Sequence, residues 1–392
     1  MPTKKNTKTT DIKSLINQLL STPSISCTSA QIDQSNLPVI HLLADWFESL
    51  GFNCEIQTLA HDKNKANLIA TLGTGNNGLV LAGHTDTVPL DEALWNIDPF
   101  QATEKDDRLY GLGSCDMKSF FAVIIEALKI FDLSKIKQPL IILATADEET
   151  SMSGAKAIAN NARRLGIHHA RAAIIGEPTN MKPIRMHKGM LMESIQLTGQ
   201  AGHSSDPSLG NNALEAMHKV ISELLSWRDE LQSKYKNPLF EIPIPTMNFG
   251  HIHGGDNPNR ICGSCELQID IRPLPGMRLD DLRAEMKQRL QHVLLETGIQ
   301  LKTTPLTDGF DALDTDKNAE IVKLAEKMTN SESQIVAFGT EAPHYNSIGL
   351  ETIVMGPGSI NQAHQPDEYI ELKSLNPAVD ITRQFISHYC FQ

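Results

Sequence analysis

The stretch PLIILATADEET, residues 139–150, decides the fold of this chain. It joins an apolar run to three successive acidic residues, and similar short runs end in polar clusters elsewhere: NLIATL (67–72), GLVLAG (78–83) and RAAIIG (171–176). Stretches with helical spacing of apolar residues separate them, at about 119–131 and 153–164. Strands of this kind are typical of a sheet that is covered on both faces. The sequence therefore predicts an α/β fold.

The middle of the chain has a different pattern. Strand-like and helical segments alternate there in the order βαββαβ, with strands at about 187–198, 246–253, 261–272 and 299–304 and helices at about 211–230 and 279–296. This order is typical of a ferredoxin-like α+β unit, and its edge strands could pair with a second copy. After about residue 306 the α/β pattern returns. We expect a catalytic domain formed by 1–183 and 306–392, interrupted by an inserted lid or dimerisation domain at 184–305, and 392 residues suit two domains.

Composition excludes several classes of protein. The formal net charge is −12, which disfavours binding to nucleic acid or to an anionic membrane surface. No apolar run approaches the roughly 20 residues of a membrane helix, and MPTKKNTKTT (1–10) lacks the apolar segment of a secretory signal. The six cysteines are too scattered for a disulfide framework. Cys262 and Cys265 form a CxxC, but they lie in a strand-like segment where residues three apart point to opposite faces. We expect a soluble, cytoplasmic protein.

Five polar clusters follow the predicted strands, directly or within a few residues. They are GHTDTVP (83–89) with His84 and Asp86, GLGSCDMK (111–118) with Asp116, ATADEET (144–150) with Glu148 and Glu149, IIGEPT (174–179) with Glu177, and GSINQAHQPDEY (358–369) with His364. Taken singly, each has an ordinary explanation, such as a helix N-cap for Asp116 or a solvated acidic turn for the glutamates. Ligands of α/β proteins lie beyond the carboxyl ends of the strands, so we expect the clusters to meet there.

Together the clusters supply two histidines and several carboxylates. This donor set fits two divalent cations that share a bridging carboxylate, and imidazole with carboxylate suits zinc without any cysteine. Two such ions would polarise a carbonyl group and generate hydroxide near neutral pH. The sequence therefore predicts a two-metal hydrolytic site.

The strings GHTDTVP, CDMK, ADEET, GEPT and GPGSINQAHQPDEY resemble those of the di-zinc exopeptidase and deacylase family, and the resemblance runs from about residue 12 to the end. It implies two Zn²⁺ per subunit, with Co²⁺ as the alternative metal, and a cis peptide bond after Asp116. It also implies a role for each cluster: His84 and Glu177 on one zinc, Glu149 and His364 on the other, Asp116 bridging both, Glu148 as the general base for a bridging hydroxide, and Asp86 orienting His84.

Longer strings, among them MNFGHIHGGDNPNRIC (247–262), imply a substrate within that family: N-acetyl-L-ornithine, cleaved to L-ornithine and acetate in arginine biosynthesis. The resemblance assigns His203, in AGHSS (201–205), to a catalytic role across a homodimer. It assigns Arg260, with Asn259 beside it, to binding the substrate α-carboxylate, since Arg offers a planar fork. We add Glu341, in GTEAPH (339–344), as a partner for the substrate side-chain ammonium.

Two alternatives stay open. The same metal site could remove a succinyl group from diaminopimelate or act broadly on N-acyl amino acids, because the substrate pocket and not the metal site separates these reactions. A non-catalytic metal-binding dimeric scaffold is the alternative of another class, although no ligand is missing. A third hypothesis, a nucleotide-binding loop at GLGSC (111–115), fails because GxG without a third glycine is a weak match. The role of Cys115, beside Asp116, is left open.

Overall fold

The computed structural model describes residues 10–392. The N-terminal segment 1–10, in which the sequence predicts no secretory signal, therefore lies almost wholly outside the described residues. The chain forms two compact units, named here the large unit (residues up to Met186, Thr315–Gln334 and Thr340–Gln392) and the small unit (His187–Asp314 and Ile335–Gly339). The small unit thus extends beyond the boundary expected at 305 and includes a short return segment that the sequence did not indicate.

The large unit is built on a mixed sheet with the order β1-β2-β6-β3-β7-β15-β8. The strands are β1 (Asn53–Thr58), β2 (Ala66–Leu72), β6 (Leu140–Thr145), β3 (Gly78–His84), β7 (Ala170–Pro178), β15 (Glu351–Gly356) and β8 (Ile184–His187). β3 pairs in parallel with β6 and β7, and β15 pairs in parallel with β7. The carboxyl ends of these four strands therefore lie at one edge of the sheet.

Helices bury both faces of this sheet. One core cluster combines alternate strand residues with the inner faces of α1 (Ile12–Leu20), α2 (Leu37–Ser49), α3 (Ser119–Leu128), α7 (Glu320–Thr329) and α9 (Leu372–Ile386). α4 (Ser153–Asn160) and α8 (Ala342–Asn346) contact each other and the sheet without joining that cluster, so they cover the opposite face. Every residue of β3 and β6 is buried. The α/β fold predicted from the apolar runs is confirmed.

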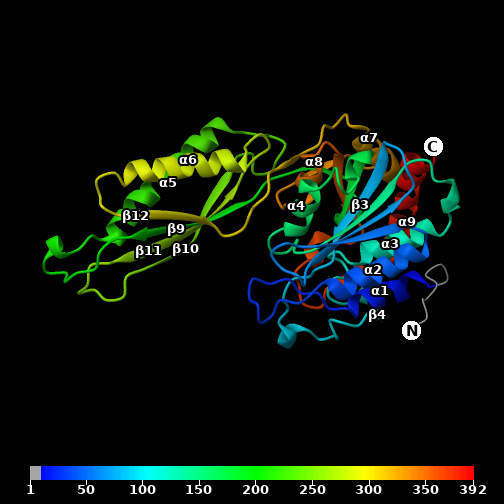
Figure 1. The fold of residues 1–392 in the computed structure, drawn as a ribbon, viewed down its shortest axis with the longest axis horizontal. Coiled ribbons are helices and arrows are strands. Elements are labelled where there is room, and N and C mark those ends of the chain that lie inside the picture. Colours follow the sequence, from blue (N-terminus) through cyan, green and yellow to red (C-terminus); the bar gives the residue numbers. More distant parts are fainter. Residues whose placement is uncertain (1–9) are drawn as a thin grey trace. The chain divides into compact units, whose positions relative to one another are not determined.

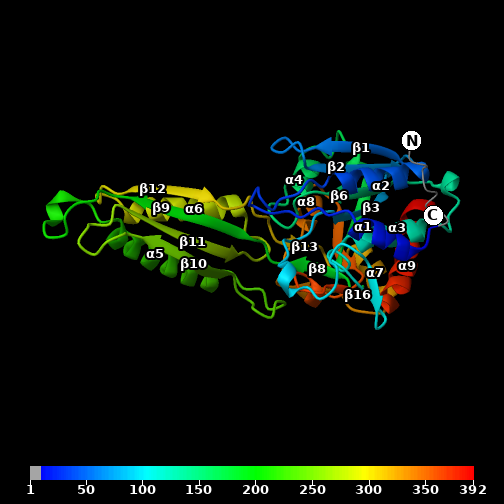
Figure 2. The same ribbon diagram turned by 90° about the horizontal axis from the view of Figure 1, so that it is seen from below.

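The small unit has the element order β9 (Leu191–Thr198), α5 (Ala213–Lys234), β10 (Thr246–Gly254), β11 (Ser264–Arg272), α6 (Leu279–Val293) and β12 (Gln300–Pro305). Its strands form an antiparallel sheet with the order β10-β11-β9-β12, and both helices lie on one face of it (Figures 1 and 2). The predicted βαββαβ order is confirmed. Buried and half-exposed residues alternate along β11, so that its apolar side faces the helices.

Shorter elements complete the described chain. A small sheet joins β16 (Tyr369–Glu371), β5 (Arg108–Tyr110) and β4 (Thr103–Lys105), and two further short strands are β13 (Leu313–Asp314) and β14 (Gln334–Val336). Short 3₁₀ turns occur at Glu92–Leu94, Leu133–Lys135, Ile167–His169, Pro207–Leu209 and Ile360–Gln362, and a π-helical turn at Ser387–Phe391. Within residues 10–392, none of the helices is long and apolar enough to span a membrane.

Candidate metal centre

The parallel strands bring four of the five predicted clusters to one edge of the large-unit sheet. His84 is the last residue of β3, the ADEET residues follow β6, Glu177 lies near the end of β7, and His364 follows β15 in a loop. Asp116 joins them from the turn before α3. The N-cap of α3 is Lys118, so the alternative of Asp116 as a simple N-cap does not hold.

Asp116 lies between the two histidines. His84 Nε2 is 3.1 Å from Asp116 Oδ1, and His364 Nε2 is 3.6 Å from Asp116 Oδ2. His84 Nε2 also lies 3.7 Å from Glu177 Oε1, and His364 Nε2 lies 3.0 Å from Glu149 Oε2. Each oxygen of Asp116 thus faces a different histidine–glutamate pair, which is the arrangement that a bridging carboxylate needs.

Glu148 lies against the same group of ligands. One atom each of His84, Glu148 and Glu177 falls within 4.8 Å of the others, and the same holds for His84, Asp116 and Glu149. Distance alone therefore does not separate Glu148 as a base from Glu148 as a ligand, and its role as the base stays a prediction.

The Asp86 carboxylate holds the backbone of the acidic turn. It accepts hydrogen bonds from the amides of Glu148 (3.2 Å) and Glu149 (3.1 Å). The nearest contact of the His84 Nδ1 atom is the backbone oxygen of Asp86 at 3.0 Å, whereas the Asp86 carboxylate is 3.8 Å away. Asp86 is thus beside His84 as expected, but its carboxylate mainly positions the segment that carries Glu148.

The electrostatics of the site favour positive charge. Burial raises the pKa of Glu148 and that of Glu177 well above the usual range of a glutamate side chain. Repulsion between acidic neighbours adds to the effect. The hydrogen bond to Glu149 raises the pKa of His364 to about 9. Burial alone would lower the pKa of His84, but the hydrogen bond to Asp116 and nearby carboxylates raise it. Buried carboxylates in such number need protons or cations, and the mixed imidazole and carboxylate donors fit divalent metal ions.

Two buried groups near this site were not predicted from the sequence. Glu368 is buried and accepts hydrogen bonds from the backbone amides of the turn that carries Asp116. Lys118 is buried as well, and its Nζ donates to the backbone oxygen of Thr22 and to Ser24 Oγ. Their only sequence signal was proximity, because Glu368 follows His364 by four positions and Lys118 follows Asp116 by two.

Cys115, whose role the sequence left open, is buried and packs between the two ligand loops. Its thiol donates to the backbone oxygen of Ser359 at 3.4 Å, and burial raises its pKa. The peptide bond between Asp116 and Met117 is cis, as the family resemblance implied. All six cysteines are free thiols, including Cys262 and Cys265.

Glu341 does not have the environment expected of a substrate-binding residue. Its side chain is fully buried at the start of α8, and its two oxygens accept hydrogen bonds from Thr145 Oγ1 (2.7 Å) and the Tyr345 hydroxyl (3.3 Å). Burial raises its pKa to about 7. Both oxygens of Glu341 thus already accept hydrogen bonds inside the large unit, and the pairing of Glu341 with a substrate ammonium stays a prediction.

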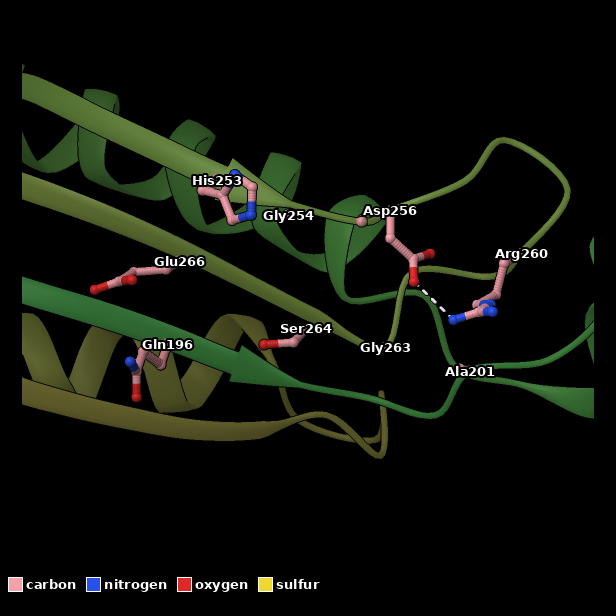
Figure 3. Close-up of a pocket in the computed structure, with 10 residues that line it drawn as sticks. Gln196, Ala201, His253, Gly254, Asp256, Arg260, Gly263, Ser264 and Glu266 are labelled. Carbon is pink, nitrogen blue, oxygen red and sulfur yellow. Dashed lines mark hydrogen bonds and ion pairs between the residues drawn. The ribbon is translucent and has the colours of Figure 1, made fainter.

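The remaining predicted residues lie together in the small unit. His203 and Arg260 form a β-bridge, and the amide of Ser204 donates to the backbone oxygen of Asn259 at 3.0 Å. Arg260 lines a cavity of about 450 Å³ beside the strand ends and forms an ion pair with Asp256 at 2.6 Å (Figure 3). The other polar side chains at this cavity are those of Gln196, His253, Ser264 and Glu266.

Comparison with solved structures shows that the chain has a known fold. The chain shares its fold with a metallo-carboxypeptidase of Sulfolobus solfataricus (TM-score 0.72, 19% identity, 95% of this chain and 98% of that one). The model of peptidase family M20/M25/M40 matches residues 80–388, and the chain belongs to this family. The predicted family is thereby confirmed.

Two curated relatives are similar over nearly the whole chain. The acetylornithine deacetylase of Pectobacterium carotovorum subsp. carotovorum (strain PC1) is 49% identical over 376 residues, covering 96% of this chain and 97% of the relative. The acetylornithine deacetylase of Proteus mirabilis (strain HI4320) is 50% identical over 377 residues, covering 96% of each.

Proposed function

We propose that this protein is a metal-dependent hydrolase that deacetylates N-acetyl-L-ornithine to L-ornithine and acetate, a step in arginine biosynthesis. The observation that carries the proposal is the position of Asp116, whose two oxygens face the separate pairs His84–Glu177 and His364–Glu149. The two curated acetylornithine deacetylases support the choice of substrate. A cytoplasmic location stays a prediction.

The donor set suits two zinc ions, with cobalt as the alternative metal. His84 and Glu177 would hold one ion, Glu149 and His364 the other, and Asp116 both. Bound there, the ions would polarise the amide carbonyl and lower the pKa of the attacking water.

The chain supplies the proton transfers. Glu148 would take the proton from the attacking water oxygen and later give it to the leaving amine nitrogen of ornithine. Burial raises the pKa of Glu148, which makes its carboxylate a stronger base for the proton of the attacking water. The Asp86 carboxylate would hold Glu148 in position, since it accepts hydrogen bonds from the backbone amides of Glu148 and Glu149.

Substrate binding falls to the small unit. We propose that Arg260, with Asn259 beside it, binds the α-carboxylate of the substrate. Arg260 now pairs with exposed Asp256, an ion pair that solvent weakens, so an incoming carboxylate can compete for the guanidinium. We also propose a homodimer in which His203, exposed in its own unit, serves the partner's site.

The test is amine release by the purified protein from N-acetyl-L-ornithine, N-acetyl-L-methionine and N-succinyl-L,L-diaminopimelate at equal concentration, with and without chelator and added zinc. We expect a preference for N-acetyl-L-ornithine that chelator abolishes and zinc restores. Glu148→Gln should retain the bound metal and lose about 10²–10⁴-fold in kcat, while Glu92→Gln, at an exposed site, should match the wild type.

Each other outcome has a defined meaning. A preference for the succinyl substrate would overturn the substrate assignment and leave the metal chemistry intact. Near-normal turnover by Glu148→Gln would remove this residue as the base. Failure to hydrolyse all three compounds, in protein shown to hold two metal ions, would contradict the proposed function.

A further inference from the structure

Glu368 lies just before β16, outside the ligand set, and only 1% of its surface is exposed. Its Oε1 accepts hydrogen bonds from the amides of Cys115 (2.7 Å) and Asp116 (2.9 Å), and its Oε2 accepts from the amide of Gly113 (3.0 Å). One buried carboxylate thus binds three amides of the single turn that presents Asp116.

The same region joins this turn to the loop that carries His364. The amide of Gly111 donates to the backbone oxygen of Glu368 at 2.9 Å, and the Cys115 thiol donates to the backbone oxygen of Ser359 at 3.4 Å. His364 lies between Ser359 and Glu368 in the sequence. The contacts therefore fix the two ends of the His364 loop against the Asp116 turn.

A carboxyl group with two acceptor oxygens is well suited to this task. Both of its oxygens accept hydrogen bonds from backbone amides, and a buried amide left without an acceptor is destabilising. Glu368 belongs to neither group of potential metal ligands. These groups are His84, Asp116 and Glu149, and His84, Glu148 and Glu177. Glu368 therefore acts on the site through the backbone of Asp116.

We infer that Glu368 is a positioning residue that sets the bridging carboxylate of Asp116 at the correct distance from His364, and so allows two metal ions to bind. The inference rests on the proposed function only in taking Asp116 as the bridging ligand. Asp86 does the corresponding work for Glu148 and Glu149, so two buried carboxylates each hold the backbone of one functional turn.

The test compares Glu368→Gln with Glu371→Gln, which makes the same change of charge three positions further on at a side chain 43% exposed. The glutamine amide group would point a donor at one or more of the three backbone donors and break part of the set. We expect bound zinc to fall from two ions per chain towards one, and kcat for N-acetyl-L-ornithine to fall about 10–100-fold with KM nearly unchanged. Glu371→Gln should match the wild type.

Hydrogen exchange in chelator-treated protein gives a readout that needs neither metal nor substrate. The amides of Gly113, Cys115 and Asp116 should exchange at least about tenfold faster in Glu368→Gln, because they lose about 1.4 kcal/mol or more of protection. Two bound zinc ions, unchanged exchange and unchanged kcat in this variant would overturn the inference.

Two further comparisons keep the outcome clear. If Glu368→Gln fails to fold, Glu368→Asp keeps the charge but withdraws the oxygens by one methylene, and it should show the same losses in smaller measure. If the wild type binds two zinc ions but does not hydrolyse N-acetyl-L-ornithine, the proposed function fails, while zinc content and exchange still decide the role of Glu368.

Discussion

Glu341 shows how a single buried carboxyl group can link stability to pH. Its pKa is raised by burial from 4.5 to about 7 in the folded chain. Between these values the folded state keeps a proton that the unfolded state releases, so this group makes the protein less stable as the pH rises from about 4.5 to 7. Glutamine mimics the protonated form. We expect Glu341→Gln to exceed the wild type in stability at pH 8 by about 2–3 kcal/mol, and the gain to disappear near pH 4.5.

Thermal unfolding of chelator-treated protein at pH 5 and pH 8 measures this difference as a shift of several degrees in Tm. Glu332→Gln, at an exposed position of the same unit, serves as the control and should not change with pH relative to the wild type. A stability difference for Glu341→Gln that is the same at both pH values would contradict the assignment.

At the scale of elements, the turn between β6 and α4 depends on a buried ion pair. Lys65 Nζ lies 3.2 Å from Asp147 and 2.7 Å from Asp33, and its side chain is 3% exposed. Asp147 has a positive φ of 59° and accepts from the Ser26 hydroxyl at 3.0 Å, so the pair holds an uncommon conformation immediately before Glu148. We expect Lys65→Met to lower the stability by about 3 kcal/mol, because buried Asp147 then keeps only the exposed His61, 3.6 Å away, as an ion-pair partner.

The measurement is Tm together with kcat for Lys65→Met and for Lys63→Met, which removes an exposed lysine two positions earlier. Both quantities should fall for Lys65→Met only, since the turn presents Glu148 and Glu149. Equal behaviour of the two variants would show that the ion pair does not hold the turn.

At the scale of the whole molecule, the two units carry different parts of the proposed reaction. The predicted metal ligands belong to the large unit, whereas His203 belongs to the small one. If His203 acts across a homodimer, mixing inactive His203→Ala with inactive Glu148→Gln should restore activity, because each hybrid dimer has one site with both residues intact. Random exchange would give about a quarter of wild-type activity, since half of the dimers are hybrids with one intact site of two.

Subunit exchange is verified by native mass spectrometry of differently tagged chains, and His203→Ala should keep its metal. Hybrid dimers without recovered activity would refute the role in trans. A monomer in solution would refute the homodimer itself.

Much of the architecture is determined by local pattern. Apolar runs long enough for one buried strand, such as 140–145, predicted the α/β sheet, and alternation predicted the βαββαβ unit. The clusters at the strand ends predicted where ligands meet, because parallel strands bring their carboxyl ends to one edge. These features depend on the spacing of apolar residues and on the order of strands and helices along the chain, and both can be read from the sequence.

Other properties were decided only by tertiary structure. The sequence could not show that Glu341 is buried against Thr145 and Tyr345 rather than open to substrate, or that the Asp86 carboxylate holds the amides of Glu148 and Glu149. Nor could it show that Glu368 binds the turn of Asp116, about 250 residues away in the chain. The physical reason is common to all three. A carboxylate is chemically the same wherever it occurs, and its burial and the donors that reach it are determined by segments that only the folded chain brings together.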